Sequence, residues 1–152
     1  MIIEVDETNL LQAGEIHSIS WKESHQSFCT PDFVNIHTTE NQQEYIRNKI
    51  KCGSKFYMLV EEKPIGVVSI KENLIEDLYI LPDRQNMGYG TKLLQFAIKQ
   101  CIGIPTLWIL ENNIRAKKLY CRMGFQETGR INAITDNLNE IELSLLKNEK
   151  NR

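Results

Sequence analysis

Hydrophobic residues recur along this chain with two spacings, and the changes between them divide the sequence into strands and helices. A spacing of two, or a short run of β-branched and aromatic residues, predicts a strand. A spacing of three and four predicts a helix with one apolar face. The predicted strands are residues 2–5, 56–60, 65–70, 74–80, 105–110, 125–131 and 141–145. The predicted helices are one that follows Asn9, one at 40–50, one from Thr91 to near Gly103, and one from Asn112 or Asn113 to Gly124.

The first predicted helix has a start signal and an apolar face, but no clear end. Asn9 belongs to the residue types that cap helix N-termini. Beyond residue 19 the hydrophobic spacing loses its period, and Thr30-Pro31 resembles a second helix start. The residues expected to point from this helix to the core are Leu10, Leu11, Ala13, Ile16 and Ile19.

These elements follow one another in the order β-α-α-β-β-β-α-β-α-β-β, which predicts an α/β (α+β) fold. We expect a mixed central sheet of about seven strands with about four helices. Four polar residues, 61–64, separate two β-rich runs and predict an antiparallel hairpin. A helix separates strands 74–80 and 105–110, so these two strands are expected to run parallel.

Composition narrows the class of protein further. The 152 residues are 41% hydrophobic and 25% charged, which is typical of one soluble globular domain. A net charge of −2 argues against nucleic acid or an anionic membrane as partner. The chain has neither an apolar run that could span a bilayer nor the pattern of a signal peptide at its start. Cys101 and Cys121 fall at helical apolar or half-buried positions, so buried thiols are expected rather than disulfides. A cytoplasmic location follows as an expectation.

The stretch from Ile75 to Leu94 carries the strongest chemical signal. A buried strand is stopped by Pro82, and a turn containing Gly88 and Gly90 leads into an amphipathic helix. Such a turn directs free backbone amides and the positive end of the helix dipole to one point, which suits a phosphate or pyrophosphate. A plain tight connection explains the glycines equally well. The dinucleotide-binding and P-loop patterns do not fit, because the third glycine and the Gly-Lys-Ser/Thr step are missing.

Two motifs in this half of the chain resemble a known family. Gln85-x-x-Gly88-x-Gly90 resembles the acetyl-CoA signature of the GNAT family of N-acetyltransferases. The segment from Asn113 to Phe125 resembles the family's Asn-x-x-Ala-x-x-x-Tyr-x-x-x-Gly-Phe pattern. Both motifs occur in the family's order and are separated by the expected strand. The resemblance covers residues 75–125 and implies a single GNAT acetyltransferase domain over residues 1–152. The first 55 residues match only in their helical outline.

The resemblance implies acetyl-CoA as the acyl donor and assigns residues to it. Backbone amides of the glycine turn would hold the pyrophosphate, and residues 78–80 would bond the pantetheine arm like an added strand. The two central parallel strands of the family separate to admit that arm. Arg84 is equally well explained as a solvated surface charge. The implied coenzyme-binding residues are Leu78, Tyr79, Ile80, Arg84, Gln85, Met87, Gly88, Tyr89, Gly90, Thr91 and Asn113.

Amide formation from a thioester requires a neutral amine, an acid for the leaving thiolate and support for the oxyanion. Tyr120 matches the family's tyrosine that protonates the sulfur, and an unperturbed phenol pKa of about 10 suits this role. The alternative is an aromatic residue that only holds the helix to the sheet. Asn113 matches the family's asparagine that bonds the pantetheine, and it can cap its helix at the same time.

Two neighbouring carboxylates, Glu76 and Asp77, are the candidates for the base. As strand neighbours they are expected to point to opposite faces of the sheet. Glu76 matches the family position that faces the acetyl group and is the first candidate, acting directly or through water, with Asp77 as the reserve. Alternatively, both carboxylates only solvate the start of the strand.

The sequence says less about the site that binds the amine acceptor than about the coenzyme site. Trp21, His25 and Phe28 are candidates for its wall, with Trp21 favoured slightly as a core residue. The three histidines are too scattered for a metal site. The expected function is direct transfer of an acetyl group from acetyl-CoA to an amine in a ternary complex. The amine is a small molecule or a peptide, and a homodimer through the last strands fits the family. The alternative is a non-catalytic acyl-CoA-binding regulatory or sensor module.

Overall fold

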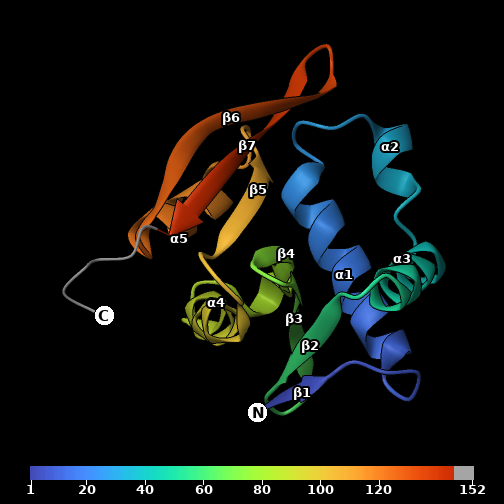
Figure 1. Ribbon diagram of the computed structural model, residues 1–152. Coiled ribbons are helices and arrows are strands. Elements are labelled where there is room, and N and C mark those ends of the chain that lie inside the picture. Colours follow the sequence, from blue (N-terminus) through green and yellow to red (C-terminus); the bar gives the residue numbers. More distant parts are fainter. Residues whose placement is uncertain (146–152) are drawn as a thin grey trace.

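Seven strands form one mixed sheet with helices on both faces, and the chain described here is a computed structural model covering residues 1–145 (Figure 1). The spatial order of the strands is β1-β2-β3-β4-β5-β7-β6. The strands are β1 (Ile2–Glu4), β2 (Lys55–Val60), β3 (Pro64–Lys71), β4 (Leu74–Ile80), β5 (Thr106–Leu110), β6 (Phe125–Thr135) and β7 (Leu138–Leu145). The helices are α1 (Leu10–His25), α2 (Pro31–Asn35), α3 (Thr39–Lys51), α4 (Tyr89–Gln100) and α5 (Ile114–Arg122), with a short 3₁₀ turn η1 (Pro82–Arg84).

The predicted fold class and strand order along the chain are confirmed, with one helix more than expected. Helix α2 accounts for the difference. Thr30 accepts a hydrogen bond from the Phe33 amide, and Pro31 occupies the first turn, so the second start signal begins a helix of its own. Within residues 1–145, no helix combines the length and the apolar character that crossing a membrane requires.

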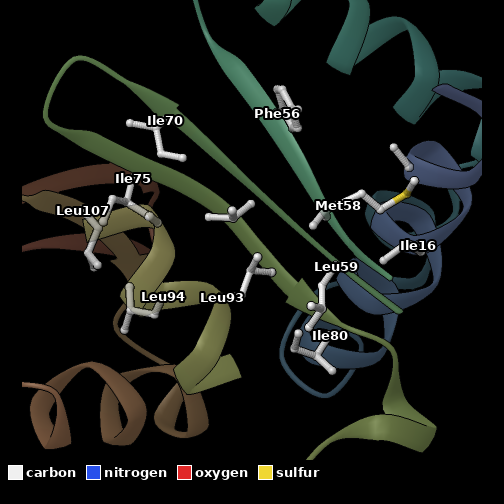
Figure 2. Close-up of a cluster of buried hydrophobic side chains, with 14 of the residues drawn as sticks. Ile16, Phe56, Met58, Leu59, Ile70, Ile75, Ile80, Leu93, Leu94 and Leu107 are labelled. Atoms are coloured by element: carbon white, nitrogen blue, oxygen red, sulfur yellow. The ribbon is translucent and has the colours of Figure 1, made fainter. Parts of the chain in front are cut away.

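The core lies on both faces of the central strands. Figure 2 shows Ile16 and Met58 on the side covered by α1, and Leu93 and Leu94 reaching the sheet from α4. Because strand side chains alternate between faces, β2 and β3 contribute to both halves of this core. Burying each such side chain contributes about 1.5–3 kcal/mol to the stability of the fold.

Helix α1 differs from its sequence prediction in two respects. The Asn9 side chain does not cap the helix: its amide donates to the Glu4 carbonyl, and its oxygen accepts from the Asp6 amide. Leu11 and Ile19 are exposed instead of buried. The buried face passes through Leu10, Ala13, Ile16, His17 and Ser20, so the inner face of this helix is partly polar.

The central strands separate where the resemblance predicted. Strands β4 and β5 run parallel and pair at Leu74 with Thr106 and at Ile75 with Leu107. No further pairing between them occurs in the part of the chain that the structure describes. The remainder of β4 therefore leaves an opening in the middle of the sheet.

Candidate active site

A cavity of about 300 Å³ lies beside this opening, between α1, the end of β4, the start of α4 and one face of α5. Its wall combines the glycine turn, three basic side chains and two tyrosines. The lining residues are Ser20, Ser24, Leu78, Tyr79, Ile80, Gln85, Asn86, Gly88, Gly90, Thr91, Asn113, Arg115, Ala116, Lys118, Leu119, Tyr120 and Arg122.

The sequence-predicted residues fall into two groups around this cavity. Most of the coenzyme-binding candidates line it, together with the candidate acid Tyr120. Arg84, Met87 and Tyr89 are not among the lining residues, and the Met87 side chain is 61% exposed. Met87 nevertheless belongs to the glycine turn, and Tyr89 is the first residue of α4. The backbone of both residues therefore lies at the rim of the cavity.

The N-terminus of α4 has a geometry that could hold an anion. Gly88 is its N-cap residue with φ of +84°, a conformation that residues with a Cβ seldom adopt, and no side chain caps the helix. The first amides of a helix have no intrahelical partner, so those of α4 are available together with the positive end of its dipole. A Cβ at Gly90 would lie 3.4 Å from Leu119 Cδ2, so the cradle and α5 are in contact.

Gln85, the first residue of the glycine motif, forms part of a polar bridge across the mouth of the cavity. Its amide nitrogen donates to the Ile80 carbonyl at 3.0 Å, and its oxygen accepts from the Arg115 guanidinium. Arg115 also forms an ion pair with Glu23 of α1 at 2.7 Å. We call Glu23, Gln85 and Arg115 the clasp; it joins α1 to α5, a contact that no pattern in the sequence predicts.

Tyr120 is buried in the cavity wall, with its ring 5.8 Å from that of Phe125 in an edge-on contact. Burial raises the pKa of Tyr120 well above the ordinary value of a phenol, and the negative charge of Asp77 adds to the shift. The unperturbed phenol pKa that the sequence suggested for Tyr120 is therefore wrong. Tyr120 stays protonated across the physiological range, so its phenol is a hydrogen-bond donor rather than a ready source of a free proton.

The two candidate carboxylates do not point to opposite faces of the sheet, contrary to the sequence prediction. Between Val67 and Ser69 of β3 the register shifts by one residue, so β4 carries an extra residue, and Asp77 has φ of +54°. Such a bulge interrupts the alternation of side chains. As a result Glu76 contacts Lys49 of α3. The Asp77 side chain lies on the same face of the sheet, against α1 and α3.

Asp77 is the centre of a buried polar network. Its carboxylate accepts hydrogen bonds from Ser69 Oγ at 2.9 Å and from the Tyr45 hydroxyl at 3.0 Å, and it contacts His17 Nε2 at 2.9 Å. His17 Nδ1 in turn lies 2.7 Å from Gln42 Nε2. Burial alone would raise the pKa of Asp77, but these hydrogen bonds from His17 and Ser69, with the charge of Lys49, hold it below its ordinary value. Asp77 is therefore ionised, and its carboxylate is held in place by hydrogen bonds from the protein.

Glu76 is held differently, with its carboxylate 2.6 Å from Lys49 Nζ and its side chain 31% exposed. Neither Glu76 nor Asp77 is among the described residues that line the cavity. Asn113 does line it, and its side chain also accepts from the Ala116 amide at 3.2 Å, so its predicted role as a helix cap is confirmed.

The aromatic residues of α1 form a stack beside the cavity. Trp21 is half-buried between the rings of His25, at 4.1 Å, and His37, at 3.4 Å. Burial lowers the pKa of His25 to about 4, so its ring is neutral at physiological pH. Trp21, His25 and Phe28 are not among the cavity-lining residues. Within residues 1–145 the four cysteines are free thiols, but the expected burial is wrong: Cys101 is half-buried and Cys121 is exposed.

Several candidate functional residues were not predicted from the sequence. Ser20 is 1% exposed and lines the cavity, and its hydroxyl has no hydrogen-bond partner among residues 1–145. The other missed residues are Arg115, Lys118 and Arg122, which share one face of α5. Their spacing of three and four residues was a signal that pointed to a common face, but not to what that face borders.

Comparisons with known proteins agree with this geometry. The sequence model of the acetyltransferase (GNAT) family matches residues 14–125. A peptidyl-lysine N-acetyltransferase, YjaB, of Salmonella typhimurium is 31% identical over 70 residues, which cover 46% of this chain and 48% of the relative. The chain thus matches about half the length of its curated relatives.

Solved structures match over nearly the whole chain. The PaiA N-acetyltransferase of Thermoplasma acidophilum, solved with coenzyme A, has a TM-score of 0.68 at 18% identity and is covered to 96%, with 93% of this chain. The apo form of YjaB from Escherichia coli has a TM-score of 0.66 at 21% identity, covering 97% of this chain and 98% of that one. At such identities these structures establish a common fold.

Proposed function

Because this chain belongs to the acetyltransferase (GNAT) family, we propose that it is an N-acetyltransferase that moves an acetyl group from acetyl-CoA directly to an amine. Residues 1–152 would form a single catalytic domain, of which 146–152 lie outside the described residues. One observation supports this function above all others. The uncapped, glycine-led N-terminus of α4 opens into a cavity beside separated parallel strands, where a phosphate group and an extended chain can both be held.

The residues of the cavity fit acetyl-CoA in two respects. The pyrophosphate would accept hydrogen bonds from the backbone amides of residues 87–91, which no cap satisfies. The orphaned Ser20 hydroxyl offers a polar partner inside the cavity. The pantetheine arm would lie along Leu78–Ile80, with Asn113 and Gln85 contributing side chains. Arg84 would contribute only at the rim, since it does not line the cavity.

In the reaction, acetyl-CoA supplies the acetyl group as a thioester: the amine nitrogen bonds to the carbonyl carbon and the C–S bond breaks. Tyr120 would donate its phenolic hydrogen bond to the departing sulfur and pass on its proton as charge develops there. Its raised pKa keeps the phenol protonated until then. The buried setting also strengthens the hydrogen bond, because little water competes for it.

For the proton that the amine loses, we propose Glu76 acting through water. It does not line the cavity, but it is partly exposed and so can reach a water chain. Asp77 is the less suitable base, since all its contacts hold it as a carboxylate within the protein. Its network would instead fix the bulge of β4 beside the cavity.

The acceptor is an amine of a small molecule or of a peptide. The relative named as a peptidyl-lysine N-acetyltransferase makes a lysine side chain the first peptide acceptor to test. Three statements stay predictions from the sequence: the homodimer through the last strands, the absence of a nucleic-acid partner, and the cytoplasmic location.

The function is tested by calorimetric titration with acetyl-CoA, followed by measurement of thiol release with a panel of amines. The panel holds polyamines, amino acids, aminoglycosides and lysine peptides. Binding with thiol release on one amine class is the expected result. Binding without release on any amine would favour a sensor module, and absence of binding would refute the proposal.

The position of the site is tested by Gly90→Trp. The indole would fill the space between the cradle and Leu119 and cover the free amides, because even a Cβ approaches Leu119 to 3.4 Å. We expect acetyl-CoA affinity to fall beyond detection in the same titration, while the circular dichroism spectrum keeps its helical signal. Unchanged affinity would place the coenzyme elsewhere.

A further inference from the structure

One face of α5 presents a row of cations to the cavity. Arg115, Lys118 and Arg122 all line it, and their spacing of three and four residues places them along one side of the helix. Leu119, on the same face, contacts the cradle at Gly90, so the row begins beside the proposed pyrophosphate site. The cations therefore border the site instead of facing open solvent alone.

Ion pairs among residues 1–145 balance only one of the three cations that line this cavity. Its lining contains three cations and no carboxylate, in a chain whose net charge is −2. Arg115 is paired with Glu23 in the clasp. Lys118 and Arg122 form no ion pair with any of the residues 1–145, whereas the neighbouring Lys117, on another face, is paired with Glu127 at 3.1 Å. Two like charges four residues apart repel each other on a helix, and a bound anion would remove that repulsion.

Coenzyme A carries two separate phosphate sites, and the cradle accounts for only one of them. The free amides of α4 suit the pyrophosphate, which leaves the 3′-phosphate of the ribose without a partner. We propose that Lys118 and Arg122 bind this 3′-phosphate and so make the protein selective for the 3′-phosphorylated coenzyme. This inference rests on the proposed function, because it assumes that the coenzyme occupies the cavity.

The chemistry of the two side chains suits a phosphate monoester. Such a group carries a charge of about −1.5 to −2 near pH 7 and three acceptor oxygens. The Arg122 guanidinium can bond two of these oxygens together, and the Lys118 ammonium adds a compact charge. Both side chains are exposed, so their attraction is screened by salt. We therefore expect a moderate selectivity, about tenfold at physiological ionic strength, which corresponds to one or two charge-assisted hydrogen bonds.

The test compares two ligands on three proteins by calorimetry at one fixed salt concentration. The ligands are acetyl-CoA and its 3′-dephospho analogue. The proteins are the unaltered chain, the double variant Lys118→Ala/Arg122→Ala, and Lys117→Ala as a control that removes a cation from the same helix outside the cavity. We expect the unaltered chain and the control to prefer acetyl-CoA about tenfold. The double variant should lose that preference by binding acetyl-CoA more weakly, with its affinity for the dephospho analogue unchanged.

Each other outcome contradicts the inference in a distinguishable way. Equal affinity of the unaltered chain for both ligands would show that the 3′-phosphate is not recognised. An equal loss for both ligands in the double variant would assign the two cations to the pyrophosphate. Absence of binding of either ligand to the unaltered chain would refute the proposed function itself, and this inference with it. If the alanine variant fails to fold, Lys118→Gln/Arg122→Gln keeps the side-chain length and is judged by the same comparison.

Discussion

At the scale of a single residue, the buried side chain of Ser20 indicates that the cavity binds a ligand. Its hydroxyl is out of contact with solvent and has no partner in the described part of the chain, although most buried polar groups are hydrogen-bonded. Leaving such a group unpaired costs about 1–3 kcal/mol. A cost of this kind is tolerated at sites where a ligand supplies the missing partner, and Ser20 lies in the wall of the candidate active site.

Ser20→Ala should therefore change stability and binding in opposite directions. We expect the free energy of unfolding to rise by about 1 kcal/mol, because the unpaired hydroxyl is removed and alanine favours the helix. Acetyl-CoA affinity should fall about two- to tenfold, the loss of one hydrogen bond. Urea unfolding and calorimetry measure the two effects. Ser18→Ala is the matched control: that hydroxyl donates to the His37 carbonyl, so its loss should lower stability and leave affinity unchanged. Unchanged acetyl-CoA affinity in Ser20→Ala would contradict the ligand-binding role.

Tyr120→Phe separates catalysis from binding. The change removes only the phenolic hydroxyl, so acetyl-CoA affinity should stay within about twofold while kcat falls about 10²- to 10⁴-fold, the range of a general acid. Because burial raises the pKa of Tyr120, loss of its proton should not reduce the rate of the unaltered protein up to about pH 10. Tyr57→Phe, on β2 and against Phe96, serves as the control. An unchanged kcat in Tyr120→Phe would leave this tyrosine a purely structural role.

At the level of the elements, the parts specified by local signals were predictable. The turn into α4 follows from Pro82, Gly88 and Gly90, and α5 follows from Asn113 and Gly124, because capping and turn residues act within a few positions of themselves. The bulge at Asp77 could not be predicted, since it arises from the register between β3 and β4. The same holds for the clasp and for Ser20, whose environments combine segments far apart in the chain.

The aromatic stack that joins α1 to the segment around α2 predicts a pH-dependent stability. Burial lowers the pKa of His25 to about 4, against an ordinary value of 6.5, so the unfolded chain binds a proton more readily than the folded one. The stabilising contribution is complete above pH 6.5 and is lost as the pH falls toward 4, by a total of about 2–3 kcal/mol. Denaturant unfolding between pH 7 and 4 measures this slope. In His25→Asn the free energy of unfolding should depend less steeply on pH. The dependence that remains would come from His37, whose pKa is also lowered by burial, to a smaller extent. A slope that is unchanged in the variant would assign the effect to other groups.

Across the whole molecule, two halves meet at the cavity with few direct links. Strands β4 and β5 pair at two positions and then separate (Figure 1). The clasp provides a further link, between α1 and α5. A ligand held between the halves would therefore add contacts that the free protein lacks. Saturation at a hundred times the dissociation constant stabilises any protein by about 2.7 kcal/mol. Here the added protection against hydrogen exchange should be concentrated in the unpaired part of β4 and in β5.

The clasp itself competes with that ligand. Glu23 holds Arg115, which lines the cavity, at 2.7 Å, and so a carboxylate lies next to a cation of a cavity proposed to receive phosphates. Glu23→Gln removes this negative charge and frees the guanidinium, so acetyl-CoA affinity should rise about two- to fivefold, the range of one exposed ion pair. Calorimetry at low and high salt measures the gain, which should shrink as salt screens the charges. Glu61→Gln is the matched control: it breaks an ion pair with Lys92 of similar exposure away from the cavity, and should leave affinity unchanged. A fall in affinity in Glu23→Gln would mean that Glu23 orients Arg115 for the coenzyme, and the clasp would then be part of the binding site instead of its competitor.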